Sequence, residues 1–283
     1  MFVMYERFSR ASMNPYLVIE SRIDKLVATG LYDRIGSWPE LAARSPFIAQ
    51  CRRTPGGFLP LEMIYDNRPV GDTLIQRLAD RYYLNGALCR GARVRLRQAT
   101  HWLRQQIEDR LSRQESASVL SLASGGARDV IDAVGGADWA DRVRYLGVDL
   151  DPQAVTYAHH RALAAGLNGR FRFEMGNALR PPRAWENRFD IVTSLGLFDY
   201  LRDSTAVRLL DRIHALLRPG GALLFGMVTS NPNQRFFEDY LNWRMIYRSP
   251  EHILGLARAS KFEQIRAVSN HDDYFFLVAC QRL

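Results

Sequence analysis

The stretch VLSLASGGARDV, residues 119–130, begins as an apolar run typical of a buried β-strand, breaks at a pair of glycines and resumes in a form that can open a helix. Glycine lets the backbone at such a turn pass close to a ligand, and the first turn of a helix offers N–H groups that have no intrahelical partner. Two glycines between a strand and a helix also occur for steric reasons alone. The stretch therefore predicts a strand, a turn and a helix, and it raises the question of what the turn binds.

The chain from residue 117 onward continues this pattern. Short apolar runs rich in Val, Ile, Leu and Phe alternate with longer helical segments, which is typical of a parallel sheet with crossover helices. Only a short polar turn separates the last two runs, so we expect a hairpin that ends the sheet with an antiparallel strand. The predicted fold class is α/β, a doubly wound sheet whose seven strands fall at 118–124, 142–150, 170–177, 189–198, 221–228, 262–269 and 274–281.

The first part of the chain has a different pattern. Apolar residues recur at helical spacing in PYLVIESRIDKLVATGLY (15–32) and DTLIQRLADRYYL (72–84), with Pro and Gly interruptions between these segments. Such spacing predicts helices that bury one face. We therefore expect an N-terminal helical lobe, or lid, over residues 1–114 and a cofactor-binding sheet domain over residues 115–283.

Charge and hydropathy limit the partners of the chain. The net charge is +8, but the basic residues are spread along the chain and do not gather into a basic tail. A small-molecule substrate is therefore expected, and no nucleic acid. No apolar run of about 18 residues is present, and the first residues lack the pattern of a signal peptide. We expect a cytoplasmic protein with no membrane span, and the oligomeric state is left open.

The sequence marks no metal site. Cys51, Cys89 and Cys280 lie far apart and lack the CxxC spacing of a zinc or redox site. His159 and His160 are adjacent on a predicted helix, so their side chains point about 100° apart and cannot share a metal ion. The prediction is a site without a metal ligand set.

Polar and small residues follow several of the predicted strands. In an open α/β sheet, ligands bind beyond the carboxyl ends of the strands, near the point where the strand order reverses. A carboxylate after the second strand can accept both ribose hydroxyls, and an Asn amide can pair with an adenine edge. The pattern predicts a nucleoside site. Its candidate cofactor-binding residues are Ser121, Ala123, Ser124, Gly125, Asp149, Leu150, Asn177, Ala178, Ser194 and Phe198.

Two cofactors contain such a nucleoside: a dinucleotide such as NAD, and S-adenosylmethionine. A dinucleotide site needs the spacing GxGxxG, so that a helix N-terminus meets the pyrophosphate. The segment ASGGARD, residues 123–129, does not have this spacing. The pattern therefore favours S-adenosylmethionine.

Five segments carry a resemblance to a known family: VLSLASGG, YLGVDLDP, GNAL, FDIVTSLGLFDYL and LLRPGGALLFGMV. Together they resemble the successive motifs of class I S-adenosylmethionine-dependent methyltransferases over residues 117–281. The resemblance implies a Rossmann-like sheet and S-adenosylmethionine as cofactor. An acidic residue often begins the first motif of that family, whereas this chain has Ser121 there. The departure weakens the expected hold on the ammonium group of the cofactor.

A narrower resemblance extends into the helical lobe, from about residue 55 to the C-terminus. It is carried by MIYDNRPVGDTLIQRLADRYYLNGALCRGARVR, GLFDYLRD and NPNQRFFEDYLNWRMIYRSPEHILGLA. These segments are similar to a bacterial group named for extracellular-factor 3-hydroxypalmitic acid methyl ester biosynthesis. The resemblance implies a methyl donor site and a carboxylate acceptor.

The expected reaction is O-methylation of a small-molecule carboxylate. A carboxylate is ionised at pH 7 and needs no strong general base, in agreement with a sequence that marks no His–acid or Lys arrangement. Aromatic rings can face a sulfonium through cation–π contact, which makes Tyr82, Tyr83, Phe198 and Tyr200 the candidate catalytic residues; packing is their alternative role. The candidate acceptor-binding residues are Tyr65, Asn67, Tyr240, Trp243, Arg244 and Tyr247.

Two alternatives stay open at this point. The same fold can cyclise S-adenosylmethionine, because its α-amine can attack the carbon next to sulfur and expel methylthioadenosine, as in the azetidine-2-carboxylate synthases, which resemble diverged methyltransferases. That reaction needs a neutral, desolvated amine, and Ser121 in place of an acid favours it. The second alternative is a cofactor-binding protein without chemistry, or one whose arginines hold RNA.

Overall fold

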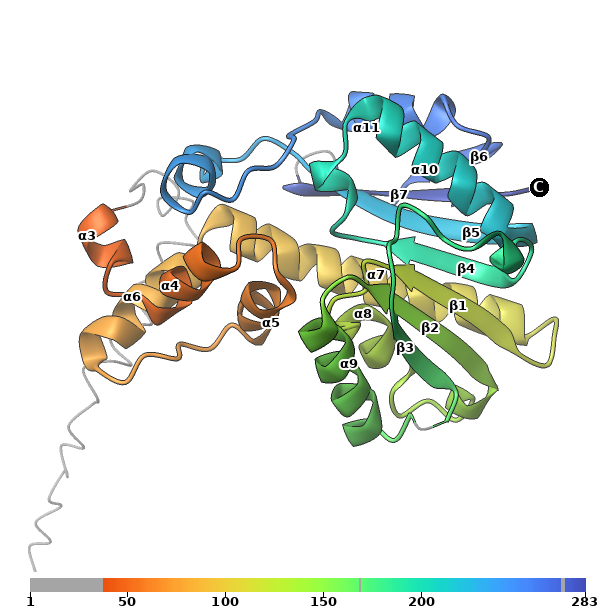
Figure 1. Cartoon of the computed structure of the whole chain (residues 1–283), viewed down its shortest axis with the longest axis horizontal. Helices are drawn as coiled ribbons and strands as arrows, with labels where there is room; N and C mark the ends of the chain where they lie inside the picture. The colour runs from red at the N-terminus through yellow and green to blue at the C-terminus, as the bar shows by residue number, and fades with distance from the viewer. Residues whose placement is uncertain (1–37, 168, 271–272) are drawn as a thin grey trace, which may run out of the picture.

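The computed structural model describes residues 38–167, 169–270 and 273–283. A helical lobe and a sheet domain lie side by side (Figure 1). The helix predicted within residues 15–32 lies outside the described residues, whereas the helix predicted within 72–84 is confirmed as α6, Leu74–Leu84. The first elements of the lobe are α3 (Pro39–Ala42), α4 (Pro46–Arg53), α5 (Phe58–Asp66), α6 and the long helix α7 (Ala87–Leu111).

The sheet domain contains the predicted seven strands. Their order is β3-β2-β1-β4-β5-β7-β6, and β7 runs antiparallel to both of its neighbours, which confirms the terminal hairpin. The chain moves outward in one direction through β1, β2 and β3 and then in the other through β4 and β5, so the order reverses between β1 and β4. The strands are β1 (Ala117–Leu122), β2 (Val143–Asp149), β3 (Phe171–Met175), β4 (Phe189–Ser194), β5 (Leu217–Val228), β6 (Gln264–Ala267) and β7 (Phe275–Gln281).

Helices cover both faces of the sheet. One buried cluster joins α7, α8 and α9 to the strands, through residues such as Trp102, Val130 and Ala158. The other joins α10 and α11 to the opposite face, through residues such as Ile213 and Ile253. The doubly wound arrangement is therefore confirmed. The covering helices are α8 (Arg128–Val134), α9 (Pro152–Ala164), α10 (Asp203–Leu216) and α11 (Pro250–Arg258), with short 3₁₀ turns at Ala140–Arg142, Arg183–Trp185 and Phe198–Tyr200.

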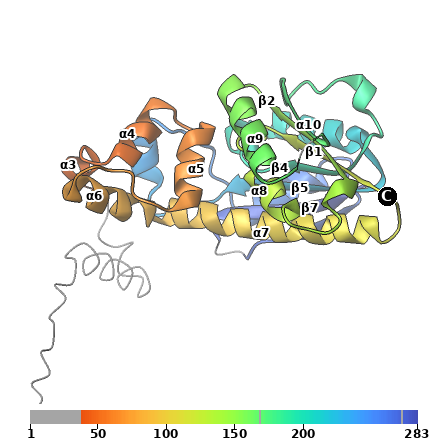
Figure 2. The ribbon, with the colours of Figure 1, turned by 90° about the horizontal axis from the view of Figure 1, so that it is seen from below.

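Helix α7 belongs to both parts of the molecule. Its first residues, including Leu88 and Ala92, pack in the core of the lobe, and its later residues, including Leu103 and Ile107, pack on the sheet. Figure 2 shows the helix running along both parts. The predicted boundary at residues 114 and 115 follows the end of this helix. All of α7 therefore lies on the lobe side of that boundary, although its later residues pack on the sheet.

A late segment of the chain returns to the lobe. Residues 229–249 connect β5 to α11 and include a π-helical turn, Phe236–Tyr240. Phe237, Leu241 and Trp243 of this segment are buried in the core of the lobe. The lobe is therefore fixed to the sheet domain by two passages of the chain, and it stands beside the carboxyl ends of the central strands.

Candidate functional site

A strained turn connects β1 to α8. Ala123, Gly125 and Ala127 all have φ near the left-handed region, at 55°, 50° and 51°. This conformation costs an alanine roughly 1–2 kcal/mol, and such strain is concentrated at ligand-binding sites. The Ser124 N–H donates to the Val148 carbonyl oxygen at 3.0 Å, so the turn is anchored to the neighbouring strand β2. The turn follows β1, next to the point where the strand order reverses, and ligands of open α/β sheets bind there.

Asp149 holds the turn from the end of β2. Its Oδ2 accepts a hydrogen bond from the Gly125 N–H at 2.8 Å, and its Oδ1 accepts one from the Asp151 N–H at 3.0 Å. A carboxylate has about four acceptor positions, so these two bonds leave it the capacity to accept from ligand hydroxyls as well. The carboxylate that the sequence assigns to ribose is thus aligned beside the glycine turn.

Apolar side chains are exposed at the same edge of the sheet. Leu150 follows β2 and is 67% exposed, and Met175 at the end of β3 is 64% exposed. Leu179 is also exposed, and its N–H donates to Asn177 Oδ1 at 2.9 Å. Ala178, between Asn177 and Leu179, is buried. Exposed apolar side chains at a ligand-binding edge suit a flat aromatic ring.

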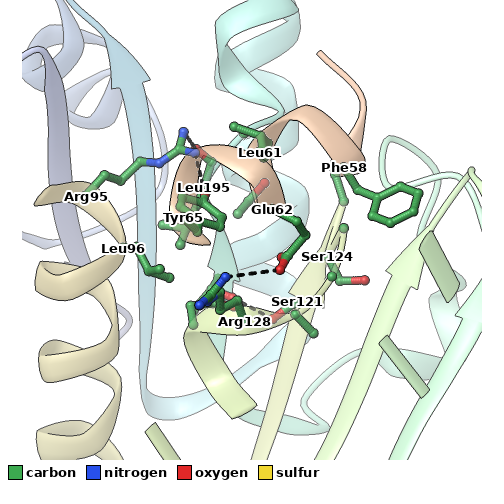
Figure 3. A pocket seen from close by; sticks show the side chains of 18 of the residues that line it. Phe58, Leu61, Glu62, Tyr65, Arg95, Leu96, Ser121, Ser124, Arg128 and Leu195 are labelled. Carbon is green, nitrogen blue, oxygen red and sulfur yellow. Dashed lines mark hydrogen bonds and ion pairs between the residues drawn. The ribbon is translucent and has the colours of Figure 1, made fainter. Parts of the chain in front are cut away.

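A cavity of about 70 Å³ lies between the glycine turn and the lobe. Figure 3 shows its lining, with α5 on one side and the turn on the other. The hydroxyl of Ser121 lies 2.7 Å from that of Thr193, and the Ser194 hydroxyl donates to the Leu122 carbonyl oxygen at 3.1 Å. Of the residues predicted from the sequence, those that line the cavity are Ser121, Ala123, Ser124, Gly125, Ser194 and Tyr65.

Charged side chains of both signs line this cavity, and sequence analysis missed them: Glu62, Arg95, Arg128 and Asp129. Asp129 lies in the first turn of α8, three residues after the second glycine, and burial raises its pKa to about 6. Its place beside the glycine pair is the signal that could have identified it. Arg95 could not be singled out, because it is one of several arginines in a short segment. Glu62 lies on a lobe helix and belongs to no recognisable motif.

Arg95 crosses the back of the cavity. Its side chain is buried, its Nη1 donates to the Leu195 carbonyl oxygen at 2.8 Å, and its Nη2 donates to the Tyr65 hydroxyl at 2.8 Å. Its guanidinium also lies 4.3 Å from the centre of the Phe275 ring. Arg95 Nε is buried without a hydrogen-bond partner among the residues that the structure describes. The cavity therefore has a fixed positive charge with one donor unused.

Glu62 of α5 closes the cavity over the turn. The residue is 4% exposed, and its Oε2 accepts hydrogen bonds from Arg161 Nη1 at 2.7 Å, Tyr157 Oη at 3.2 Å and Arg128 Nη1 at 3.3 Å. Burial raises the pKa of its carboxyl, although both guanidinium groups act to lower that pKa. Glu62 is thus a buried carboxylate of the lobe held against the sheet domain.

Three candidate catalytic residues lie away from the cavity lining. Phe198 is 0% exposed and packs against Phe225 in the sheet core, with ring centres 5.0 Å apart. Tyr82 and Tyr83 belong to the lobe, where the Tyr83 hydroxyl donates to the Trp38 carbonyl oxygen at 2.7 Å. Burial and these contacts give the three side chains a packing role in the described structure.

The fourth candidate catalytic residue, Tyr200, stays at the junction of the two parts. Its ring is partly exposed, its hydroxyl accepts from Trp243 Nε1 at 2.8 Å, and burial raises the pKa of that hydroxyl to about 12. A Cβ atom on Gly56 would lie 2.5 Å from the Tyr200 hydroxyl oxygen, so the loop before α5 packs directly on it. Tyr200 therefore links the end of β4 to the lobe.

The remaining candidate acceptor-binding residues are dispersed. Asn67 ends α5 in a left-handed conformation, and Tyr240 stacks on Phe236 inside the lobe, 5.1 Å between ring centres. Arg244 is exposed, and burial raises the pKa of Tyr247 well above its ordinary value. Only Tyr65 of this set reaches the cavity by the glycine turn.

Within residues 38–167, 169–270 and 273–283, no group of three His, Cys, Asp or Glu side chains is placed to hold a metal ion. In the same part of the chain, no helix is both long and apolar enough to cross a membrane. Cys51, Cys89 and Cys280 are buried free thiols. Burial raises the pKa of each thiol, which opposes a role as nucleophile.

Comparisons with known proteins agree with this architecture. A family model described as "Putative methyltransferase" matches residues 56–275, which include α5, α6 and α7 of the lobe as well as the sheet. The uncharacterized protein YnbC of Escherichia coli (strain K12) is 26% identical over 214 residues, which are 72% of this chain and 36% of that protein. The chain thus spans about a third of the length of this relative.

Two solved structures are similar to the chain. A protein of Bordetella parapertussis described as a possible exported protein has a TM-score of 0.73 at 17% identity, covering 98% of this chain and 99% of that one. Magnesium protoporphyrin IX methyltransferase of Synechocystis PCC 6803, solved with bound S-adenosylmethionine, has a TM-score of 0.50 at 12% identity, covering 69% and 84%. At these identities the likeness establishes the α/β fold alone.

Proposed function

Because the chain belongs to the Putative methyltransferase family, we propose that it transfers the methyl group of S-adenosylmethionine to a small-molecule acceptor, at a carboxylate oxygen. One observation carries the choice of cofactor. The carboxyl ends of β1, β2 and β4 bring a carboxylate suited to ribose, Asp149, next to a small cavity lined by side chains of both charge signs. A nucleoside with an amino-acid end matches both features.

The adenosine part would lie along the ends of β2 and β3. Asp149 accepts from the ribose hydroxyls, and its bonds to the Gly125 and Asp151 N–H groups fix its orientation in advance. Leu150 and Leu179 supply exposed apolar surface for the purine ring, beside Asn177. Preformed geometry of this kind lowers the entropic cost of binding.

The amino-acid end would lie in the cavity at the turn. Glu62 and Asp129 supply negative charge at the cavity, and Arg95 and Arg128 supply positive charge, so groups of both signs are available to a ligand. Arg95 lines the cavity with a buried guanidinium whose Nε has no hydrogen-bond partner among the described residues, and it would supply the positive charge for a carboxylate. A zwitterion is therefore better matched to this cavity than an anion.

When bound, the cofactor would supply a methyl group attached to a positively charged sulfur. The methyl group goes to the acceptor, and the sulfur leaves as a neutral thioether. The protein then has to align donor and acceptor and exclude water, since in-line transfer needs no covalent nucleophile. Helix α5 covers the turn through Phe58 and Glu62, which removes water from that side. None of the described residues that line the cavity is a histidine or a lysine. An acceptor that is already ionised, such as a carboxylate, fits a site without a strong base.

Cyclisation of S-adenosylmethionine is the alternative reaction on this fold. It requires a neutral α-amine, whereas a carboxylate beside an amine raises the pKa of the amine and keeps it protonated. Ser121 carries no charge, but Asp129 and Glu62 line the same cavity. This arrangement supports methyl transfer over cyclisation.

The test is to incubate the purified protein with S-adenosylmethionine, with and without a panel of small carboxylic acids, and to quantify the nucleoside products by mass spectrometry. Release of S-adenosylhomocysteine that depends on an acceptor supports the proposal. Catalytic formation of methylthioadenosine without an acceptor would make the protein a lyase. Failure to bind S-adenosylmethionine in calorimetry would overturn the proposal altogether.

A further inference from the structure

The glycine turn of the sheet domain is covered by a carboxylate that comes from the lobe. We propose that Glu62 Oε1 receives the ammonium group of the bound cofactor, so that the lobe completes the cofactor site. This inference rests on the proposed function, because it assumes a ligand with an amino-acid end. It assigns to α5 a direct binding role that no motif of the sheet domain supplies.

The two oxygens of Glu62 are used differently. Oε2 accepts from Arg161, Tyr157 and Arg128, at 2.7, 3.2 and 3.3 Å. Among the described residues, no hydrogen bond reaches Oε1. That oxygen is the one nearest the turn, since a Cβ atom on Gly126 would lie only 2.5 Å from it. One oxygen therefore anchors the side chain, while the other faces the cavity with its acceptor capacity unused.

The carboxylate of Glu62 already pairs with Arg128 and Arg161 through Oε2, and it is the unused acceptor Oε1 that favours an ammonium group at this position. A buried ammonium is costly unless a carboxylate pairs with it and accepts its hydrogen bonds. Ser121 supplies no charge, and its hydroxyl is already paired with Thr193. Asp129 carries charge, but backbone N–H groups at the start of α8 already act on it. Glu62 Oε1 is then the free anionic acceptor at the turn, and Arg95 Nε is the free cationic donor.

The chain fixes Glu62 in place with contacts on both sides of α5. Arg128 of α8 pairs with Asp66 of α5 at 2.5 Å as well as with Glu62. The ring of Phe58, also in α5, lies 5.3 Å from that of Tyr157 in α9, measured between ring centres. The absence of a side chain at Gly126 leaves the space that the carboxylate occupies. These contacts join α5 to α8 and α9, so the position of Glu62 depends on the lobe being docked on the sheet domain.

The test compares three ligands by calorimetry in the full chain and in Glu62→Gln, an isosteric change that removes the charge. S-Adenosylhomocysteine has both the ammonium and the carboxylate, decarboxylated S-adenosylmethionine has the ammonium only, and methylthioadenosine has neither. We expect Glu62→Gln to weaken the first two ligands about tenfold or more, and to leave methylthioadenosine within about twofold. Glu108→Gln, which removes an exposed carboxylate of α7 that pairs with Arg104, is the control, with no expected change for any of the three.

The outcomes separate the two levels of the proposal. Equal weakening of all three ligands in Glu62→Gln would show that Glu62 only positions the lobe. Unchanged or tighter binding would show that Glu62 does not receive the ammonium group. Either result overturns this inference and leaves the cofactor assignment standing. If the unaltered chain binds none of the three, the proposed function fails, and the inference fails with it. Circular dichroism checks that each variant is folded. If Glu62→Gln is unfolded, Glu62→Asp is measured with the same three ligands, because the shorter side chain moves the carboxylate back by one methylene. This variant must then weaken the same two ligands and leave methylthioadenosine unchanged.

Discussion

Gly126 lies directly beneath the carboxylate of Glu62, so close that a Cβ atom on Gly126 would stand 2.5 Å from Glu62 Oε1 and 3.0 Å from Glu62 Cδ. The second glycine of the turn is therefore required by a contact between the lobe and the sheet domain, in addition to any ligand. Gly126 does not have a positive φ, so alanine suits its backbone, and a substitution there acts through the new Cβ atom, which would meet Glu62 and, at 3.2 Å, Tyr157 Cε1.

Gly126→Ala is expected to displace Glu62 from the turn. The shift would disturb the three hydrogen bonds to Oε2 and lower the free energy of unfolding by about 1–3 kcal/mol. It should also weaken S-adenosylhomocysteine, because the acceptor for the ammonium moves away. Denaturant unfolding and calorimetry measure both effects. Gly255→Ala is the control: a Cβ there meets nothing within 4 Å, and the substitution lies in helix α11, so stability should be unchanged or slightly higher. A fully stable Gly126→Ala chain with normal affinity would contradict the contact.

Asp149→Ala is expected to weaken every ligand that carries the nucleoside, methylthioadenosine included. The change removes the acceptor proposed for ribose and frees the Gly125 N–H, with a loss of about 1–3 kcal/mol in binding free energy. Asp151→Ala is the neighbouring control, since Asp151 Oδ1 caps α9 by accepting from the Gln153 N–H at 2.8 Å. The control should lose about 1 kcal/mol of stability and no affinity. Calorimetry that finds equal affinities for Asp149→Ala and the unaltered chain would remove Asp149 from the site.

The sequence predicts the part of the site that depends on local order. Each parallel strand leaves its last residues at one edge of the sheet, so the turn at Ser124 and Gly125 and the carboxylate of Asp149 could be placed together from strand positions alone. Their proximity is confirmed by the hydrogen bond between Gly125 and Asp149. The ligand roles proposed for them stay predictions.

The sequence could not identify what the lobe contributes. Glu62 is 66 residues from Arg128 and 99 residues from Arg161 along the chain, and no local pattern encodes so distant a pairing.

The direction of the Phe198 side chain could not be predicted from the sequence either. This residue follows β4 directly, but the 3₁₀ turn Phe198–Tyr200 directs Phe198 into the core and leaves Tyr200 partly exposed. A side chain's direction at a strand end is set by this tertiary packing, which strand periodicity does not report.

Asp129→Asn is expected to stabilise the chain at neutral and alkaline pH. Burial raises the pKa of Asp129 from 3.8 to about 6, so the folded state holds its proton more tightly than the unfolded state. The cost of the charged form is absent below about pH 4, grows as the pH rises between the two pKa values, and is complete above about pH 6, where it amounts to roughly 1–3 kcal/mol. Asn removes this cost, as binding-site charges often oppose stability. Urea unfolding at pH 8 and pH 4 should show a gain at the higher pH only; an equal gain at both would rule out the titration of Asp129 as its cause.

Tyr200→Phe and Tyr83→Phe should separate a tyrosine at the site from one in the lobe core. Tyr200 accepts from the buried Trp243 Nε1 and supports the loop at Gly56, so loss of its hydroxyl leaves an indole N–H unpaired and loosens the junction where an acceptor would enter. We expect kcat/KM for the acceptor to fall about fivefold or more, with the affinity for S-adenosylhomocysteine unchanged, because the Tyr200 hydroxyl lies outside the cavity lining. Tyr83→Phe loses the hydrogen bonds that the hydroxyl donates to the Trp38 carbonyl and accepts from the Trp38 N–H, and it should cost about 1 kcal/mol of stability while leaving the kinetics as they were. If the two substitutions alter kcat/KM equally, the site extends into the lobe core and Tyr200 has no special role at its edge.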